Sequence, residues 1–375
     1  MFDISLYSFQ VYWWLLVSIL GALFVFMTFV QGGQTLLYTL GKTDDERSLI
    51  IASLGRKWEL TFTALVMFGG ALFAAFPLFY AVSFGGAYYV WMAILFAFII
   101  QAVSYEYRLK PDNVYGKRFY ETLLYINGSA GIFLIGVALG TLYTGGSFIV
   151  NEMHLSKWTQ ASYGLEALLN PFNLAFGFTL LFISRIGASL YFYNNLENKE
   201  IEPRLLKALK VNTLLFLPPF LYLLGYMLTK ETYVYDPSTK IVSVVSMQLL
   251  ETLLSNPILL VLLVSGIILF LYAIFSALFL HKKGAIWFYG VATVIIVTVL
   301  LFILGIEHTI IYPSLSDMQS SLQIENASAS YYTLSVMSVV SILVPIVFTY
   351  IFFVWRSMDK TKITIEEVKS DHHHY

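Results

Sequence analysis

Nine long apolar runs constrain the fold of this chain more than any other feature of its sequence. They lie near residues 11–34, 60–80, 86–106, 120–143, 169–193, 211–229, 256–280, 285–306 and 332–355. A helix needs about 20 apolar residues to cross the hydrocarbon core of a bilayer, and each run is long enough. Because only helices and closed barrels satisfy their backbone polar groups in lipid, the runs predict an all-α integral membrane protein with nine transmembrane helices.

The composition agrees with a lipid environment. Hydrophobic residues make up 58% of the chain and charged residues 12%, whereas a soluble domain is roughly 45–50% apolar and about 25% charged. The stretches between the runs are short, so we expect one polytopic membrane domain over residues 1–375, with 356–375 as a tail. A net charge of −1 gives no basis for binding nucleic acid. The absence of cysteine excludes disulfides, Cys-ligated zinc and iron–sulfur clusters.

The basic residues alternate between the connections and so predict the orientation. Eighteen Lys and Arg lie in the odd-numbered connections and the C-terminal tail, and only Lys157, Lys230 and Lys240 lie in the even-numbered ones. Because Lys and Arg concentrate in cytoplasmic loops, this pattern predicts an outside N-terminus and a cytoplasmic C-terminus. The remaining basic residue, Arg185, lies inside the fifth run.

Two charged residues at membrane depth are candidate functional groups, because an unpaired charge in lipid is costly. Glu59 lies where the second run leaves the cytoplasm, and it either collects protons there or pairs with a neighbouring lysine. Arg185 lies roughly 15 Å along its helix from the cytoplasmic end, so it requires a partner. That partner is an acid of this chain, an acid of another subunit, or a lipid or cofactor headgroup. A structural ion pair is favoured over substrate binding.

The end of the first run carries the uncharged polar residues Thr28 and Gln31 beside two glycines. Neither side chain titrates, so they relay protons only through water, and close helix packing is the favoured interpretation. The histidines His154, His281 and His308 lie near helix ends or in loops, so the sequence predicts no buried haem ligand and no metal site. The terminal segment Asp371–Tyr375 is either a metal-binding tract or a plain polar tail, and the second is favoured.

Several blocks of the sequence resemble subunit II of the cytochrome bd quinol oxidases. The most specific block, GGALFAAFP from Gly69 to Pro77 followed by Tyr80, resembles the second-helix signature of that family. Shorter blocks follow in the family's order: WWLLV at 13–17, KWE at 57–59, YEYR at 105–108, LLNPF at 168–172, NPIL at 256–259, TLSVM at 333–337, VPI at 344–346 and IT at 363–364. The resemblance extends over about residues 11–365.

This resemblance implies a function for the chain. It implies a heterodimer with a haem-bearing subunit I in the bacterial inner membrane, which oxidises membrane quinol and reduces oxygen to water with cytoplasmic protons. Subunit I of the family holds two b-type haems and one d-type haem, or three b-type haems. This chain is then a haem-free subunit that supports assembly and is not catalytic alone. A structural quinone and a small third subunit are left open.

One departure from the family affects the expected proton route. Many family members carry acidic residues at the end of the first span, where this sequence has Thr28 and Gln31. The carboxylate of the second span persists as Glu59, which is therefore the best candidate proton carrier. The alternative function is a secondary transporter that uses Arg185 and Glu59 to bind an ion or substrate, but the chain lacks the internal repeats typical of many transporters.

Overall fold

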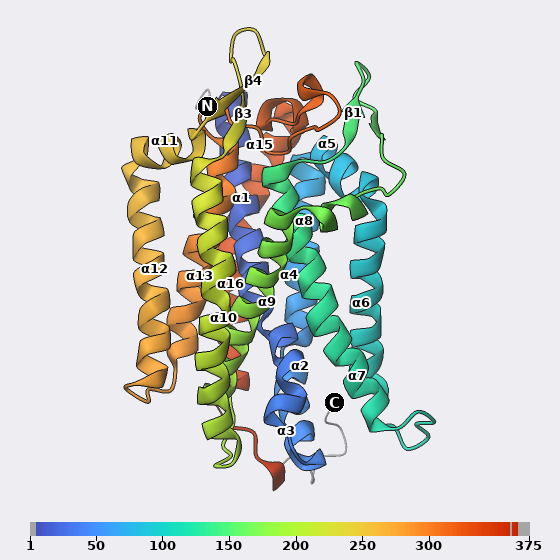
Figure 1. Cartoon of the computed structure of the whole chain (residues 1–375), viewed down its shortest axis with the longest axis vertical. Coiled ribbons are helices and arrows are strands. Elements are labelled where there is room, and N and C mark those ends of the chain that lie inside the picture. Colours follow the sequence, from blue (N-terminus) through green and yellow to red (C-terminus); the bar gives the residue numbers. More distant parts are fainter. Residues whose placement is uncertain (1–4, 361, 367–375) are drawn as a thin grey trace.

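The computed structural model describes residues 5–360 and 362–366 and shows a long helical bundle (Figure 1). Within these residues nine helical segments are long and apolar enough to cross a membrane. The first helix begins at the upper end of Figure 1, and the last one runs toward the lower end. We use "upper end" and "lower end" in this sense below.

The nine candidate spans are assembled from the following helices. They are α1 Leu6–Met27 with α2 Phe29–Leu40; α3 Asp44–Gly55 with α4 Trp58–Ala75; α6 Tyr88–Tyr107; α7 Lys117–Ile126, η2 Asn127–Gly131 and α8 Ile132–Thr144; α9 Pro171–Asn195; α10 Ile201–Thr229; α12 Pro257–Leu278; α13 Ala285–Phe302 with η4 Ile303–Gly305; and α15 Tyr331–Val340, η6 Ser341–Leu343 and α16 Val344–Met358.

Short elements connect the spans, mostly at the upper end. The helical ones are α5 Pro77–Tyr80, η1 Ala81–Gly86, η3 Leu165–Leu169, α11 Gln248–Ser255, η5 Met318–Ser320 and α14 Ile324–Ala327. Two antiparallel hairpins pair β1 Phe148–Val150 with β2 Ser156–Trp158 and β3 Glu231–Tyr235 with β4 Val242–Ser246. The register of the second hairpin places Thr232 opposite Val245.

Local sequence signals explain where several helices begin and end. The Asn170 side chain accepts hydrogen bonds from the first turn of α9, and Pro171 follows at a position whose N–H would have no helical partner. Thr43 and Glu46 form a reciprocal capping box at the start of α3. The second apolar run extends to residue 80, but α4 ends at Ala75 because Pro77 cannot donate to the helical ladder and starts α5 instead.

Small residues allow the central helices to pack closely. Helix α9 packs against α2, α8 and α10. A Cβ on Gly32 would lie 2.2 Å from the Ser184 carbonyl oxygen, and a Cβ on Gly136 would lie 2.6 Å from the Gly177 Cα. These approaches require glycine, as at many helix contacts in membranes. The ninth span, by contrast, lies at the periphery and is exposed along most of its length.

Candidate functional site

Glu59 lies on the outward face of α4, in its first turn at the lower end of the bundle. Phe62 and Val66 follow it on the same helical face and are also exposed. Among the described residues no side chain forms an ion pair with Glu59. The structure therefore gives Glu59 neither the expected lysine partner nor a place in the interior of this chain.

Thr28 marks the break between α1 and α2. Its side chain is fully buried, and its hydroxyl donates to the Val25 carbonyl oxygen at 2.6 Å. The Thr61 hydroxyl of α4 donates to the neighbouring Met27 carbonyl oxygen at 3.0 Å. Thr28 thus lies at the junction of α1 and α2, and the neighbouring Met27 carbonyl is bonded to the helix that carries Glu59.

Gln31 takes part in a buried group of polar side chains between α2, α6 and η2, which we call the polar seam: Gln31, Gln34, Gln101, Tyr105 and Asn127. Gln31 Nε2 donates to Gln101 Oε1 at 3.0 Å, and Gln34 Nε2 donates to the Tyr105 hydroxyl at 3.3 Å. Asn127 Nδ2 donates to the Ala97 carbonyl oxygen at 2.9 Å. Asn127 belongs to a π-helical turn, a local irregularity that is common at functional sites.

The polar seam has hydrogen-bonding capacity that the described protein groups do not use. The atoms Gln31 Oε1, Gln34 Oε1, Gln101 Nε2 and Asn127 Oδ1 are buried and have no partner there. Buried polar atoms are nearly always paired with protein or ordered water. The seam is therefore suited to hold water molecules, the medium that Gln31 would need to relay a proton.

A buried ion cluster lies at the lower end of the seam. Glu121 of α7 is 1% exposed and bonds Arg47 Nε at 2.9 Å and Arg108 Nη2 at 2.7 Å. Arg108 follows Tyr105 by one turn, so the cluster and the seam are continuous along α6. This cluster was not predicted from the sequence. Its only signal was an acidic residue at the second position of the fourth apolar run.

Arg185 has no ion pair in the part of the chain that the structure describes. The Arg185 Nε atom is buried and lacks a hydrogen-bond partner there. The structure thus supplies no acid of the described chain as its partner, and an acid of another subunit or a headgroup stays a prediction.

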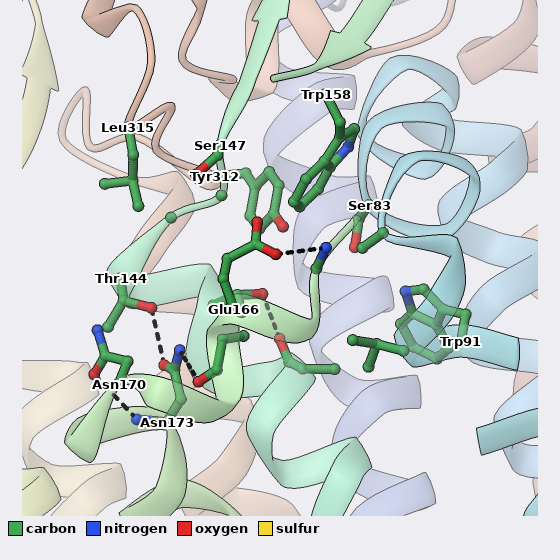
Figure 2. A pocket seen from close by; sticks show the side chains of 18 residues that line it. Ser83, Trp91, Thr144, Ser147, Trp158, Glu166, Asn170, Asn173, Tyr312 and Leu315 are labelled. Carbon is green, nitrogen blue, oxygen red and sulfur yellow. Dashed lines mark hydrogen bonds between the residues drawn. The ribbon is translucent and has the colours of Figure 1, made fainter. Parts of the chain in front are cut away.

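A cavity of about 70 Å³ lies at the upper end, between η1, α8 and the loop that leads into α9 (Figure 2). Glu166 points into it: Oε2 accepts from the Ser162 hydroxyl at 2.6 Å and from the Gly164 N–H at 2.9 Å, whereas Oε1 has no partner among the described groups. The Thr144 hydroxyl donates to Asn173 Oδ1 at 2.8 Å beneath it. This cavity was not predicted from the sequence, since its lining comes from five separate segments.

The three described histidines are not placed to ligate a haem buried in the membrane. His154 lies in the β1–β2 turn, His281 follows α12, and His308 follows η4, so none of these three lies within a candidate span. In residues 5–360 and 362–366, no three His, Cys, Asp or Glu side chains gather as a metal site. The histidines of segment 371–375 lie outside the described residues.

Comparison with known proteins assigns the chain to a class. The bundle is that of a multi-span helical subunit, and it resembles the solved bd oxidase of Geobacillus thermodenitrificans with a TM-score of 0.60, covering 93% of this chain and 98% of that one at 13% identity. The family model for cytochrome bd terminal oxidase subunit II matches residues 9–358. The chain belongs to this family and is a subunit of an oxidoreductase complex, as the sequence blocks predicted.

Individual relatives agree with this assignment. The cytochrome bd-I ubiquinol oxidase subunit 2 of Escherichia coli K12 is 28% identical over 374 residues, which cover 96% of this chain and 97% of the relative. A probable cytochrome oxidase subunit 2 of Haemophilus influenzae is 36% identical over 166 residues, or 44% of this chain. The alternative of a secondary transporter is not favoured by these matches.

Proposed function

We propose that this chain is the haem-free subunit II of a quinol:oxygen oxidoreductase, which supports a haem-bearing subunit I and delivers cytoplasmic protons toward the oxygen-reduction site. The lower end of the bundle then faces the cytoplasm and the upper end faces outward. This orientation rests on the alternation of Lys and Arg. The bacterial cytoplasmic membrane is the proposed location, since the chain belongs to a bacterial respiratory oxidase family.

The division of labour follows from the side chains. The haems of such a complex would be held by subunit I, because this chain has no cysteine and its described histidines lie outside the spans. The oxidation of membrane quinol is likewise assigned to the complex, by analogy with the ubiquinol oxidase relatives. This subunit contributes packing surface and proton-conducting groups. A structural quinone and a third subunit add no step to this proposal.

The single observation that carries the proton-delivery proposal is the position of Glu59. It is the one carboxylate in the first turn of α4, on an exposed and otherwise apolar helix face with Phe62 and Val66. A charged group on such a face is costly in lipid, so contact with a partner subunit explains its placement better than contact with acyl chains. Covered in this way, Glu59 can take a proton from the cytoplasm and pass it across the subunit boundary.

The polar seam provides a second proton-conducting element inside the chain. It begins at the ion cluster of Arg47, Arg108 and Glu121 and continues to Gln31 and Gln101. Its amides can order water without titrating. Trp58 connects the seam to Glu59, because it precedes Glu59 in the chain and stacks on Tyr105.

Replacement of Glu59 by Gln tests the proposal. In the purified two-subunit complex, Glu59→Gln should lower oxygen consumption by about a hundredfold, the lower end of the roughly 10²–10⁴-fold that a positioned proton-transfer group contributes. The haem-to-protein ratio from absorption spectra should stay unchanged. The matched control is Glu106→Gln, which removes an exposed carboxylate from the lower end of α6. Unchanged turnover in a Glu59→Gln complex of normal haem content would remove Glu59 from the proton route.

A further inference from the structure

A second cavity lies at the upper end of the bundle, and it contains a cation that forms no ion pair with a carboxylate of the described residues. Its volume is about 450 Å³, and it lies between the C-terminal ends of α8 and α10, the strand β3 and the helix α11. We call it the Lys230 cavity. It adjoins the cavity of Figure 2, with which it shares Thr144, Asn170 and Leu315.

Lys230 immediately follows α10, and its ammonium donates one hydrogen bond to the Tyr143 carbonyl oxygen near the end of α8. That bond satisfies a carbonyl for which the helix offers no further donor. An ammonium carries three N–H donors, so two remain for the cavity. No ion pair joins Lys230 to Glu231 or to any other carboxylate of the described residues.

Thr232 of β3 also lines the cavity. The side chain of this β3 residue is buried, with the residue only 5% exposed, and the Thr232 Oγ1 atom has no hydrogen-bond partner among the described groups. A buried hydroxyl without a partner is uncommon in proteins. Together with the ammonium of Lys230 it offers the donor set that a phosphate group accepts.

The surroundings of the cavity indicate a lipid as the source of that phosphate. Tyr222, Tyr226 and Lys230 follow each other at intervals of four residues and so share one face of α10. Both tyrosines are exposed, at 45% and 42%, and their rings stack with centroids 5.9 Å apart. An aromatic strip that descends from a cation at the end of a membrane span matches the boundary between headgroups and acyl chains.

Helix α11 reinforces this placement. Figure 1 shows it lying across the upper ends of the neighbouring spans, and Leu249 of α11 lines the cavity. Glu231 also lines the cavity and is exposed there. The lining thus presents a cationic donor set beside a separate carboxylate, which complements a headgroup that carries both a phosphodiester and a primary ammonium.

We propose that the Lys230 cavity binds a phospholipid of the ethanolamine type, with its phosphate on Lys230 and Thr232 and its ammonium facing Glu231. The acyl chains then lie along the strip of Tyr226 and Tyr222. A free phosphate ion shares the phosphate chemistry but neither the ammonium nor the acyl chains, and the experiment separates the two sources.

The test uses the purified two-subunit complex, depleted of lipid in detergent and titrated with phosphatidylethanolamine or phosphatidylglycerol in native mass spectrometry. We expect Lys230→Met to weaken phosphatidylethanolamine binding at least tenfold and Thr232→Val to weaken it severalfold. Glu231→Gln should abolish the preference for ethanolamine over glycerol headgroups. Lys157→Met, which removes an exposed lysine from β2 at the same end, is the control and should bind as the wild type does.

Three results would overturn the proposal. One is equal lipid binding by the wild type and Lys230→Met. The second is unchanged phosphatidylethanolamine binding by the near-isosteric Thr232→Val. This result decides the matter if Lys230→Met does not assemble because α8 loses its terminal bond. The third is stabilisation of the depleted complex against heat by inorganic phosphate alone to the same extent as by phosphatidylethanolamine, which would identify a free-anion site. The haem spectrum of each variant reports assembly separately from lipid binding.

Discussion

Trp58 stacks on Tyr105 with ring centroids 5.5 Å apart and ring planes 13° apart. This contact joins the start of α4, where Glu59 points outward, to the polar seam, where the Tyr105 hydroxyl accepts from Gln34. The Trp58 Nε1 atom is buried and has no described hydrogen-bond partner. The indole therefore lies between the two proposed proton-conducting elements and is well placed to couple them.

Replacement of Trp58 should report on that coupling. We expect Trp58→Phe to retain the stacked contact and most of the turnover, because the ring still covers Tyr105. Trp58→Ala removes the ring and should lower oxygen consumption severalfold, with a changed solvent isotope effect and an unchanged haem spectrum. If Trp58→Ala retains both the rate and the isotope effect of the wild type, the seam and Glu59 are not coupled through this position.

Loss of Glu121 should destabilise the subunit strongly. Glu121→Gln leaves Arg108, which is 1% exposed, without its carboxylate, whereas Arg47 keeps its ion pair with Asp44. Removal of one partner of a buried ion pair typically costs about 3–5 kcal/mol, because the remaining charge is uncompensated. The expected result is a marked fall in the thermal unfolding temperature and in the yield of assembled complex.

Glu106→Gln is the matched control for Glu121→Gln. Glu106 pairs with Lys110 one turn away at 2.9 Å, but both side chains are more than half exposed. Such pairs contribute little to stability. Similar unfolding temperatures for the two variants would contradict a structural role for the buried cluster.

The sequence predicted the spans far better than the ion cluster. Apolar run length and alternating charge report on the membrane directly, so nine spans could be inferred without any pairing information. Glu121 contacts Arg47 and Arg108 across separations of 74 and 13 residues, and one sequence contains no signal for such partners. From the sequence alone, Glu121 is indistinguishable from an ordinary acidic residue near a helix end.

The candidate site, too, could be predicted from the sequence only in part. Glu59 could be selected from its place at the start of a span, but the outward direction of its side chain depends on how α4 packs. Gln31 was identified as a polar residue at membrane depth, yet its bond to Gln101 follows from the approach of α2 and α6. The Lys230 cavity is lined by several segments that lie far apart in the sequence. From the sequence alone, Lys230 was only one of three basic residues in the even-numbered connections.

Substitution of Gly32 tests the packing of the seam against α9. A Cβ at this position would lie 2.2 Å from the Ser184 carbonyl oxygen, which is backbone and cannot rotate away. We expect Gly32→Ala to lower stability by about 1–3 kcal/mol or more, the range for overpacked cores. Gly70→Ala is the control, because no atom lies within 4 Å of a Cβ there. Equal thermal stability of the two variants would show that α2 and α9 are not in close contact.

Lys230 should give the stability of the subunit a specific dependence on pH. Burial lowers the pKa of Lys230 from its usual value to about 8. The unfolded chain therefore binds more protons at this site than the folded chain does between pH 8 and about 10.4. The free energy of unfolding rises with pH across that window, and the contribution of this lysine to it is least favourable below pH 8. The titratable side chains that line the cavity with it are Glu231, Tyr143, Tyr226 and Tyr233.

Thermal unfolding of the lipid-depleted complex from pH 7 to pH 10 measures this dependence. Between pH 8 and pH 10 the unfolding temperature of Lys230→Met should rise less than that of the wild type. Lys157→Met should keep the wild-type slope because Lys157 is exposed. Phosphatidylethanolamine should also reduce the slope in the wild type, since a bound phosphate stabilises the charged ammonium below pH 8. Parallel curves for the wild type and Lys230→Met would show that this lysine is hydrated in the folded complex.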